Sequence, residues 1–224
     1  MVLDSGLNEI EARPEIIMTA HIVIGTPRSG TSMTAGLLHN LSIRMFKNQG
    51  LPESEMNPRG FFQDIEFDSI FINEPKTRLF KPNPDPIPEF KKFQVIDFIK
   101  MRCQEEIDWG LKSFNLIHVF QDIYKELPSD SKFIITKRRK RSVIKSIEKW
   151  FYLGDLEYSE KLYDTAITLV DNIQETLKKK QTYILDYDKM IENVDEELNN
   201  LCSFLNKKLT REAYWFVDES LKRS

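Results

Sequence analysis

Short apolar runs alternate with amphipathic stretches along most of the chain. Four runs have the length and the β-branched or aromatic composition of buried strands: 20–25, 109–114, 132–136 and 182–187. Stretches with helical spacing of apolar residues separate them. Strands that alternate with helices in this way predict a three-layer α/β fold, with a mostly parallel sheet and helices on both faces.

The spacing of apolar residues also predicts where the helices lie. They are expected over 31–40, within 61–74, over about 89–107, between the second and third strands, and over about 140–152, 156–179 and 188–206. Residues 41–60 and 81–90 are rich in glycine or proline and are predicted to be loops. Because the chain has no internal repeat, we expect an N-terminal extension over 1–19 and one domain over 20–224.

Composition narrows the class of protein. A length of 224 residues with 41% hydrophobic and 30% charged residues suits a globular domain with a sizeable core. The net charge of −3 argues against bulk affinity for nucleic acid, so any basic function must be local. Cys103 and Cys202 lack metal-ligand spacing and are expected to be reduced thiols. The sequence has neither a run of about 18 apolar residues nor a signal peptide, so we expect a cytoplasmic protein without membrane contact.

The stretch GTPRSGTS, residues 25–32, links the first strand to the first helix. Gly25 and Gly30 permit a tight turn, and a helix N-terminus directs free N–H groups and partial positive charge to the same place. This arrangement is typical of P-loop NTPase-like folds, but Thr31 replaces the lysine of a nucleotide triphosphatase loop. Arg28 can supply the missing charge, and Thr31 and Ser32 add hydroxyl groups. The stretch predicts an anion site without naming the anion.

A second basic feature follows the third strand. Residues 137–141 are five consecutive cations that lead into a helix, where positive charge opposes the helix dipole. A bound phosphate would offset that cost, and Arg138 and Ser146 could both face it. The alternative interpretations are a solvated helix start and a run like a nuclear-localisation signal.

These motifs resemble the P-loop sulfotransferases of the bacterial-type branch, which use 3′-phosphoadenosine 5′-phosphosulfate. GTPRSGTS is similar to their 5′-phosphosulfate loop, and Arg138 and Ser146 are similar to their pair for the 3′-phosphate. The similarity extends from about residue 20 to the end of the chain. Further similar segments follow in the same order: 57–64, 109–114, 183–206 and 216–223.

The resemblance implies metal-independent transfer of a sulfuryl group to a hydroxyl or amine of a small-molecule or carbohydrate acceptor. It implies that Arg28, Ser29, Gly30, Thr31 and Ser32 hold the 5′ end of the donor. Arg28 would stabilise the charge that develops on the bridging oxygen. Lys112 would approach the same centre from the side. The alternative interpretation of Lys112 is an exposed lysine at the end of a strand.

At the expected position of the proton acceptor, the sequence departs from the family pattern. Ser113 and Phe114 follow Lys112, where cytosolic relatives have a histidine, and Gln63 stands where other relatives often have glutamate. Asp64 is the predicted base and Glu66 the reserve. Both could instead be acids that favour a helix start. A chain without both the histidine and the glutamate could also be an inactive relative.

Two other functions fit part of the sequence. A P-loop nucleotide kinase or a phosphatase-like enzyme would use Asp186, at the end of an apolar strand, to bind Mg²⁺. A non-catalytic binder would use residues 137–141 for RNA or another anionic partner, or would bind only the bisphosphate. Oligomeric state and acceptor identity are not predicted.

Overall fold

The computed structural model describes residues 18–54, 57, 59–71, 87–151, 155–177 and 181–221. Four strands form one sheet in the order β2-β1-β3-β4, and every pairing is parallel. The strands are β1 (Ala20–Gly25), β2 (Trp109–Lys112), β3 (Lys132–Lys137) and β4 (Thr182–Asp186). The predicted parallel sheet is confirmed, and the second strand ends two residues earlier than expected.

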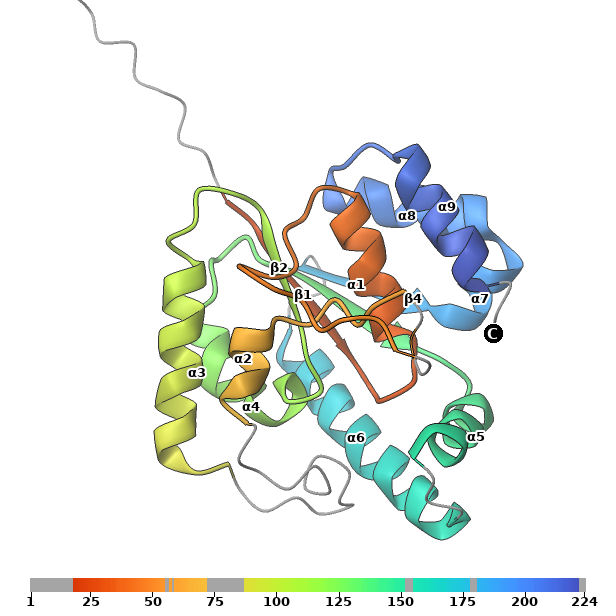
Figure 1. The fold of residues 1–224 in the computed structure, drawn as a ribbon, viewed down its shortest axis with the longest axis horizontal. Coiled ribbons are helices and arrows are strands. Elements are labelled where there is room, and N and C mark those ends of the chain that lie inside the picture. The colour runs from red at the N-terminus through yellow and green to blue at the C-terminus, as the bar shows by residue number, and fades with distance from the viewer. Residues whose placement is uncertain are drawn as a thin grey trace, which may run out of the picture.

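Helices cover both faces of this sheet (Figure 1). The described helices are α1 (Thr31–Asn40), α2 (Ile65–Ser69), α3 (Glu89–Arg102), α4 (Leu116–Ile123), the short 3₁₀ helix η1 (Tyr124–Glu126), α5 (Lys140–Phe151), α6 (Leu156–Thr176), α7 (Tyr187–Glu192), α8 (Val194–Leu205) and α9 (Arg211–Leu221). Among these described helices, none is both long and apolar enough to cross a membrane.

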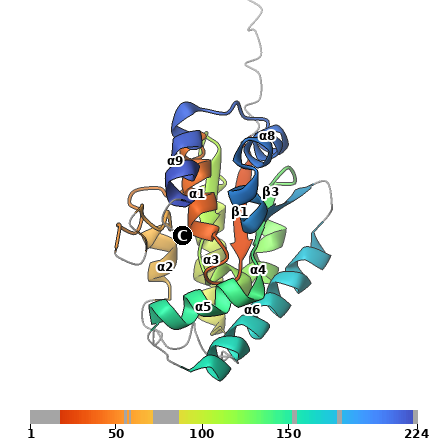
Figure 2. The same cartoon turned by 90° about the vertical axis from the view of Figure 1, so that its right-hand side faces the viewer.

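The two faces follow from alternation along the strands. Ile22 and Ile24 of β1 pack with helices α3, α4 and α6, whereas Val23 between them packs with α1, α8 and α9. Ile134 and Ile135 of β3 divide in the same way. Successive strand residues point to opposite faces, so an uninterrupted apolar run supplies both cores. Figure 2 shows α1 beside α9 on one of these faces. The predicted three-layer arrangement is confirmed.

Three helix predictions need correction. The helix expected over about 89–107 ends at Arg102, five residues earlier. The helix expected over 188–206 is two helices, because Asn193 leaves the helical region at φ −138° and ψ 63° between α7 and α8. Within 61–74, only Ile65–Ser69 is helical, and Phe62 has a positive φ of 51° that an α-helix excludes. Ile72, an apolar residue of the stretch 61–74 at a helix-like offset from Ile65, lies outside the described residues.

The register of the sheet gathers the sequence motifs at one edge. Val23 pairs with Lys112, and Gly25 pairs with Thr136 on the other side of β1. Lys137 pairs in turn with Asp186. All four strands run in the same direction, so the segments that follow them emerge together at their carboxyl ends. In open α/β sheets this edge is where ligands bind.

Candidate functional site

The glycine turn between β1 and α1 depends on close packing. Gly30 has a φ of 104°, and a Cβ atom there would lie 2.5 Å from Cδ2 of Tyr187. A Cβ atom on Gly25 would lie 2.0 Å from Oγ1 of Thr136. Neither position accepts a side chain without movement of its neighbours. The turn therefore brings its backbone close to β3 and to the start of α7.

The N-terminus of α1 presents donors at this turn. In the described part of the chain, no side chain caps α1, and its first turn has no acidic residue. Its N–H groups are therefore available to an anion. Thr31 and Ser32 lie in that first turn. Ser29 instead shapes the loop, because its hydroxyl donates to the carbonyl of Thr26 and bonds Oγ1 of Thr136, each at 2.8 Å.

Three residues from separate segments meet beside the turn. Nε of Arg28 donates a hydrogen bond of 2.9 Å to Oγ of Ser146 in α5. Nη1 of Arg138, which follows β3, lies 3.5 Å from the carbonyl oxygen of Arg28. Arg28 itself adopts a positive φ of 66°, which is uncommon for a residue with a side chain and recurs at ligand-binding sites. The two basic features of the sequence thus form one site.

The electrostatics of this site favour an anion. Burial lowers the pKa of Arg28, and the nearby positive charge of Arg138 lowers it further. The guanidinium of Arg138 stacks 4.4 Å from the ring of Tyr187. Its Nε is buried and has no hydrogen-bond partner within the described chain. Two neighbouring cations with an unused donor are stabilised by a negative group between or beside them.

Three other cations of the basic run are paired with acids of the same chain. Lys137 pairs with Asp171 at 3.6 Å, and Lys140 pairs with Asp164 at 2.6 Å, both in α6. Arg139 pairs with two acids of α7, Asp188 at 3.5 Å and Glu192 at 3.1 Å. Such exposed pairs add little stability. They do remove most of the positive surface that the run predicted for nucleic acid.

Lys112 ends β2 inside the protein, with only 1% of its surface exposed. The alternative of an exposed strand-end lysine is therefore wrong. Its ammonium donates to Oγ of Ser32 at 3.1 Å and to Oε1 of Gln63 at 2.7 Å. Burial lowers the pKa of Lys112 to about 7, with a smaller lowering effect from Arg28 and an opposing one from Asp68. Lys112 thus reaches the anion turn as a cation that readily loses its proton.

A carboxylate that the sequence did not single out lies next to this lysine. Asp68 in α2 accepts a hydrogen bond of 2.5 Å from Oγ of Ser113 and one of 2.6 Å from Nε2 of Gln63. Burial raises the pKa of Asp68, and the hydrogen bonds from Ser113 and Gln63 and the charge of Lys112 oppose this rise. The side chains of Lys112, Gln63, Asp68 and Ser113 therefore form one polar network.

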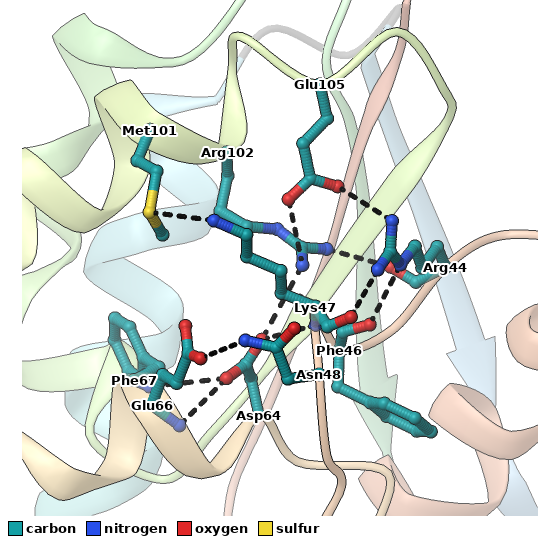
Figure 3. Close-up of polar contacts among 10 residues, drawn as sticks. All are labelled: Arg44, Phe46, Lys47, Asn48, Asp64, Glu66, Phe67, Met101, Arg102 and Glu105. Atoms are coloured by element: carbon teal, nitrogen blue, oxygen red, sulfur yellow. Dashed lines mark hydrogen bonds and ion pairs between the residues drawn. The ribbon is translucent and has the colours of Figure 1, made fainter.

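Asp64, the predicted base, faces another part of the protein (Figure 3). Its carboxylate accepts from the backbone N–H groups of Lys47, Glu66 and Phe67 and caps α2. It also lies 3.6 Å from the buried guanidinium of Arg102. Asp64 is 1% exposed, and its described contacts include neither Lys112 nor the anion turn. These contacts favour the alternative interpretation, an acid at a helix start.

Glu66, the reserve, has no described hydrogen bond or ion pair with the lysine. Its carboxylate accepts a hydrogen bond from the amide of Asn48, as Figure 3 shows. The structure therefore brings together Arg28, Arg138, Ser146, Ser32 and Lys112. The described hydrogen bonds and ion pairs of Asp64 and Glu66 are with other residues.

Sequence reasoning missed Asp68, Ser113 and Tyr187 as site residues. Ser113 directly follows Lys112, and Asp68 lies one helical turn beyond Asp64. This spacing is the signal that could have indicated Asp68. If the helix is known to begin at residue 65, position 68 is a second carboxylate one turn further along it. Tyr187 had no signal of its own, since an aromatic residue after an apolar strand usually packs in the core.

Comparison with known proteins supports the fold and the family. A sequence model of the sulfotransferase family matches residues 21–211. No curated protein matches the sequence.

Several solved structures share the fold. The sulfotransferase domain of the Synechococcus PCC 7002 olefin synthase superposes with a TM-score of 0.55 at 18% identity, over 88% of this chain and 76% of that chain. A sulfotransferase from Mycobacterium tuberculosis H37Rv gives 0.52 at 12% identity, over 90% and 71%. A sugar kinase from Janibacter sp. HTCC2649 gives 0.52 at 13% identity, over 85% and 95%. At such identities the likeness shows the fold alone, which kinases and sulfotransferases share.

Proposed function

Because this chain belongs to the sulfotransferase family, we propose that it uses 3′-phosphoadenosine 5′-phosphosulfate as its sulfuryl donor. The acceptor is a hydroxyl or amine of a small molecule or carbohydrate. The observation that carries the proposal is the meeting of Arg28, Arg138 and Ser146, three residues from separate segments, beside a glycine turn. This donor carries phosphate at both the 3′ and the 5′ position, and the site offers cationic groups for each.

The residues present fit such a donor. Without a Cβ, Gly25 and Gly30 let the turn pack closely against Thr136 and Tyr187, and no described side chain caps the N–H groups of α1 that follow it. The buried Nε of Arg138 lacks a partner within the described residues, as expected for a donor reserved for a ligand. When bound, the donor supplies an activated sulfuryl group that an acceptor oxygen or nitrogen can take.

Two parts of the site have separate tasks in this proposal. The first turn of α1, with Thr31 and Ser32, would bind the 5′ end, together with Arg28. Arg138 and Ser146 would bind the 3′-phosphate. The hydrogen bond from Arg28 to Ser146 joins the two parts at 2.9 Å and fixes the orientation of the Arg28 guanidinium. A preorganised cation of this kind stabilises negative charge that develops as the donor's bond breaks.

Lys112 would add a second positive group to the 5′ end. Its ammonium is fixed by Ser32 and Gln63, so it needs no large rearrangement to meet an anion. A negative group nearby raises the pKa of a buried lysine, because it favours the protonated form. Donor binding would therefore charge Lys112 and complete the positive site.

The structure gives less support to the rival functions. A kinase needs the loop lysine, where this chain has Thr31, and a free carboxylate for Mg²⁺. The Asp186 carboxylate instead caps α7, where it accepts from the N–H groups of Asp188 and Lys189. An RNA-binding role for residues 137–141 is disfavoured, because three of those cations are paired with acids of the chain.

Replacing Arg138 with alanine tests the assignment of the 3′ site. We expect Arg138→Ala to weaken binding of adenosine 3′,5′-bisphosphate about 10- to 100-fold, because it removes a charged hydrogen-bond donor. Binding of adenosine 5′-phosphate should change little. Isothermal titration calorimetry with both ligands measures the difference.

A matched control uses the adjacent residue. Arg139→Ala removes the same charge from an exposed side chain whose partners are Asp188 and Glu192, so both ligands should bind as they do to the wild type. Equal losses for both ligands in Arg138→Ala would refute the assignment of the 3′-phosphate.

A further inference from the structure

The polar network around Lys112 contains one carboxylate that the proposed donor site does not use. Asp68 belongs to α2, three residues before the described end of the segment 59–71. It is only partly exposed, and within the described chain no lysine or arginine forms an ion pair with it. A partly buried carboxylate without a cationic partner is costly to keep charged.

Gln63 explains how this carboxylate and Lys112 coexist. The side-chain amide of Gln63 lies between them, with Oε1 2.7 Å from the ammonium of Lys112 and Nε2 2.6 Å from Oδ2 of Asp68. The amide satisfies both groups without a direct ion pair. The nitrogen of Lys112 is thus directed at Ser32 of the anion turn and at Gln63 rather than at Asp68. A glutamate at position 63 would instead pair with Lys112 directly.

Ser113 holds the other oxygen of the carboxylate. Its hydroxyl donates to Oδ1 of Asp68 at 2.5 Å and accepts from the backbone N–H of Asn115 at 3.1 Å. The N–H donor prevents the hydroxyl from turning away. Asp68 is thereby oriented from two sides, and it lies three hydrogen bonds from the anion turn, through Gln63, Lys112 and Ser32.

We propose that Asp68 is the base that takes the proton from the acceptor. This proposal rests on the sulfuryl-transfer function proposed above. Asp68 accepts the proton of the acceptor hydroxyl or amine as the acceptor atom bonds to sulfur. The sulfur–oxygen bond to the donor's 5′-phosphate breaks at the same time, and its electron pair leaves on the phosphate oxygen. No oxidant or further reactant is needed.

The surroundings of Asp68 suit this task better than those of Asp64. A base must be reachable and must have a pKa near the working pH. Burial raises the pKa of Asp68 in that direction, whereas three backbone N–H groups and Arg102 engage the carboxylate of Asp64. Lys112 is the charged group that faces Asp68, and the remaining neighbours, Gln63, Ser113 and Asn115, are uncharged.

The experiment compares Asp68→Asn with the wild type in two assays. Calorimetry with adenosine 3′,5′-bisphosphate should give the wild-type affinity, which also shows that the variant is folded. Release of bisphosphate from the sulfated donor should fall at least about 10²-fold. That release is measured with a panel of phenols, alcohols, amines and monosaccharides, and with water alone. Asp97→Asn, an exposed acid of α3, is the matched control and should change neither assay.

A second variant keeps the carboxylate. Ser113→Ala removes a hydrogen bond that favours the charged form of Asp68, so it should raise the pKa of Asp68. The rise of the transfer rate with pH should therefore move to higher pH. NMR of ¹³C-labelled aspartate should show one carboxyl that titrates above the usual aspartate range, that moves in Ser113→Ala and that is missing in Asp68→Asn.

The outcomes separate the two proposals. If the wild type binds no bisphosphate, the proposed function is overturned, and the role of Asp68 falls with it. If the wild type binds and transfers but Asp68→Asn transfers as fast, only the role of Asp68 is overturned. Loss of transfer in Asp64→Asn or Glu66→Gln, with full transfer in Asp68→Asn, would return the role to the predicted acids.

Discussion

Replacement of Arg28 by alanine is expected to slow sulfuryl transfer about 10²- to 10³-fold, the usual effect of removing one preorganised donor from a developing negative charge. Bisphosphate binding should weaken much less, because the first turn of α1 and Arg138 remain. The reason lies in the geometry, since Ser146 accepts a hydrogen bond from Nε of Arg28 and fixes its guanidinium beside the anion turn. Single-turnover rates with the sulfated donor and calorimetry with the bisphosphate separate the two effects.

The control for this variant preserves the charge. Arg28→Lys should recover part of the rate, but not all of it, because an ammonium cannot reproduce the planar fork of a guanidinium. A rate in Arg28→Ala equal to that of the wild type would contradict the role of Arg28. Equal losses of rate and of affinity would assign it to ground-state binding instead.

Binding of adenosine 3′,5′-bisphosphate at pH 8 should take up nearly one proton per site. Lys112 has a pKa of about 7 in the unliganded protein and is therefore mostly neutral at pH 8. A phosphate beside it raises that pKa and protonates it. The ligand itself contributes little, because the second pKa of a phosphate is about 6. Calorimetry in buffers with different ionisation enthalpies measures the uptake.

The direction in which the affinity for the bisphosphate changes with pH follows from this protonation of Lys112. Affinity should rise as pH falls from 8 to below 7, because Lys112 is then already charged. Lys112→Met should abolish the uptake and flatten the dependence, and it should slow transfer about 10²-fold, since it removes a positive group from the 5′ end. An enthalpy that does not depend on the buffer in the wild type, or the same uptake in Lys112→Met, would contradict the role of this lysine.

Most of the fold could be predicted from the spacing of apolar residues. The strands at 20–25 and 132–136 each contain an uninterrupted apolar run, 22–24 and 133–135, as expected of a sheet covered on both faces. The helix pattern failed where local backbone geometry intervened. Asn193 interrupts a continuous apolar stripe between α7 and α8, although Met190, Leu198 and Leu201 all remain buried.

The anion site was predictable for a different reason. Parallel strands bring their carboxyl ends to one edge, so motifs that follow β1 and β3 had to meet once the fold was assumed. The meeting of Arg28 with Arg138 and Ser146 follows from that topology. The assignment of these residues to the two ends of one ligand remains a prediction.

The predicted base shows what a sequence cannot supply. Asp64 and Asp68 are the same residue type and belong to one short acidic stretch, so the sequence alone does not distinguish their roles. What distinguishes the two carboxylates is which residues from distant parts of the sequence contact them. Arg102, 38 positions later, engages Asp64, whereas Ser113 engages Asp68. No periodicity encodes which of two neighbouring carboxylates meets a buried arginine.

The central claim is that the site binds one adenosine ligand through both of its phosphates. The most direct test is calorimetry of the wild-type protein with adenosine 3′,5′-bisphosphate, adenosine 5′-phosphate and ATP, each with Mg²⁺ and with a chelator. We predict that the bisphosphate binds most tightly and that the chelator does not change its affinity. Equal affinities for the bisphosphate and the 5′-phosphate, or a preference for ATP that requires Mg²⁺, would contradict the account.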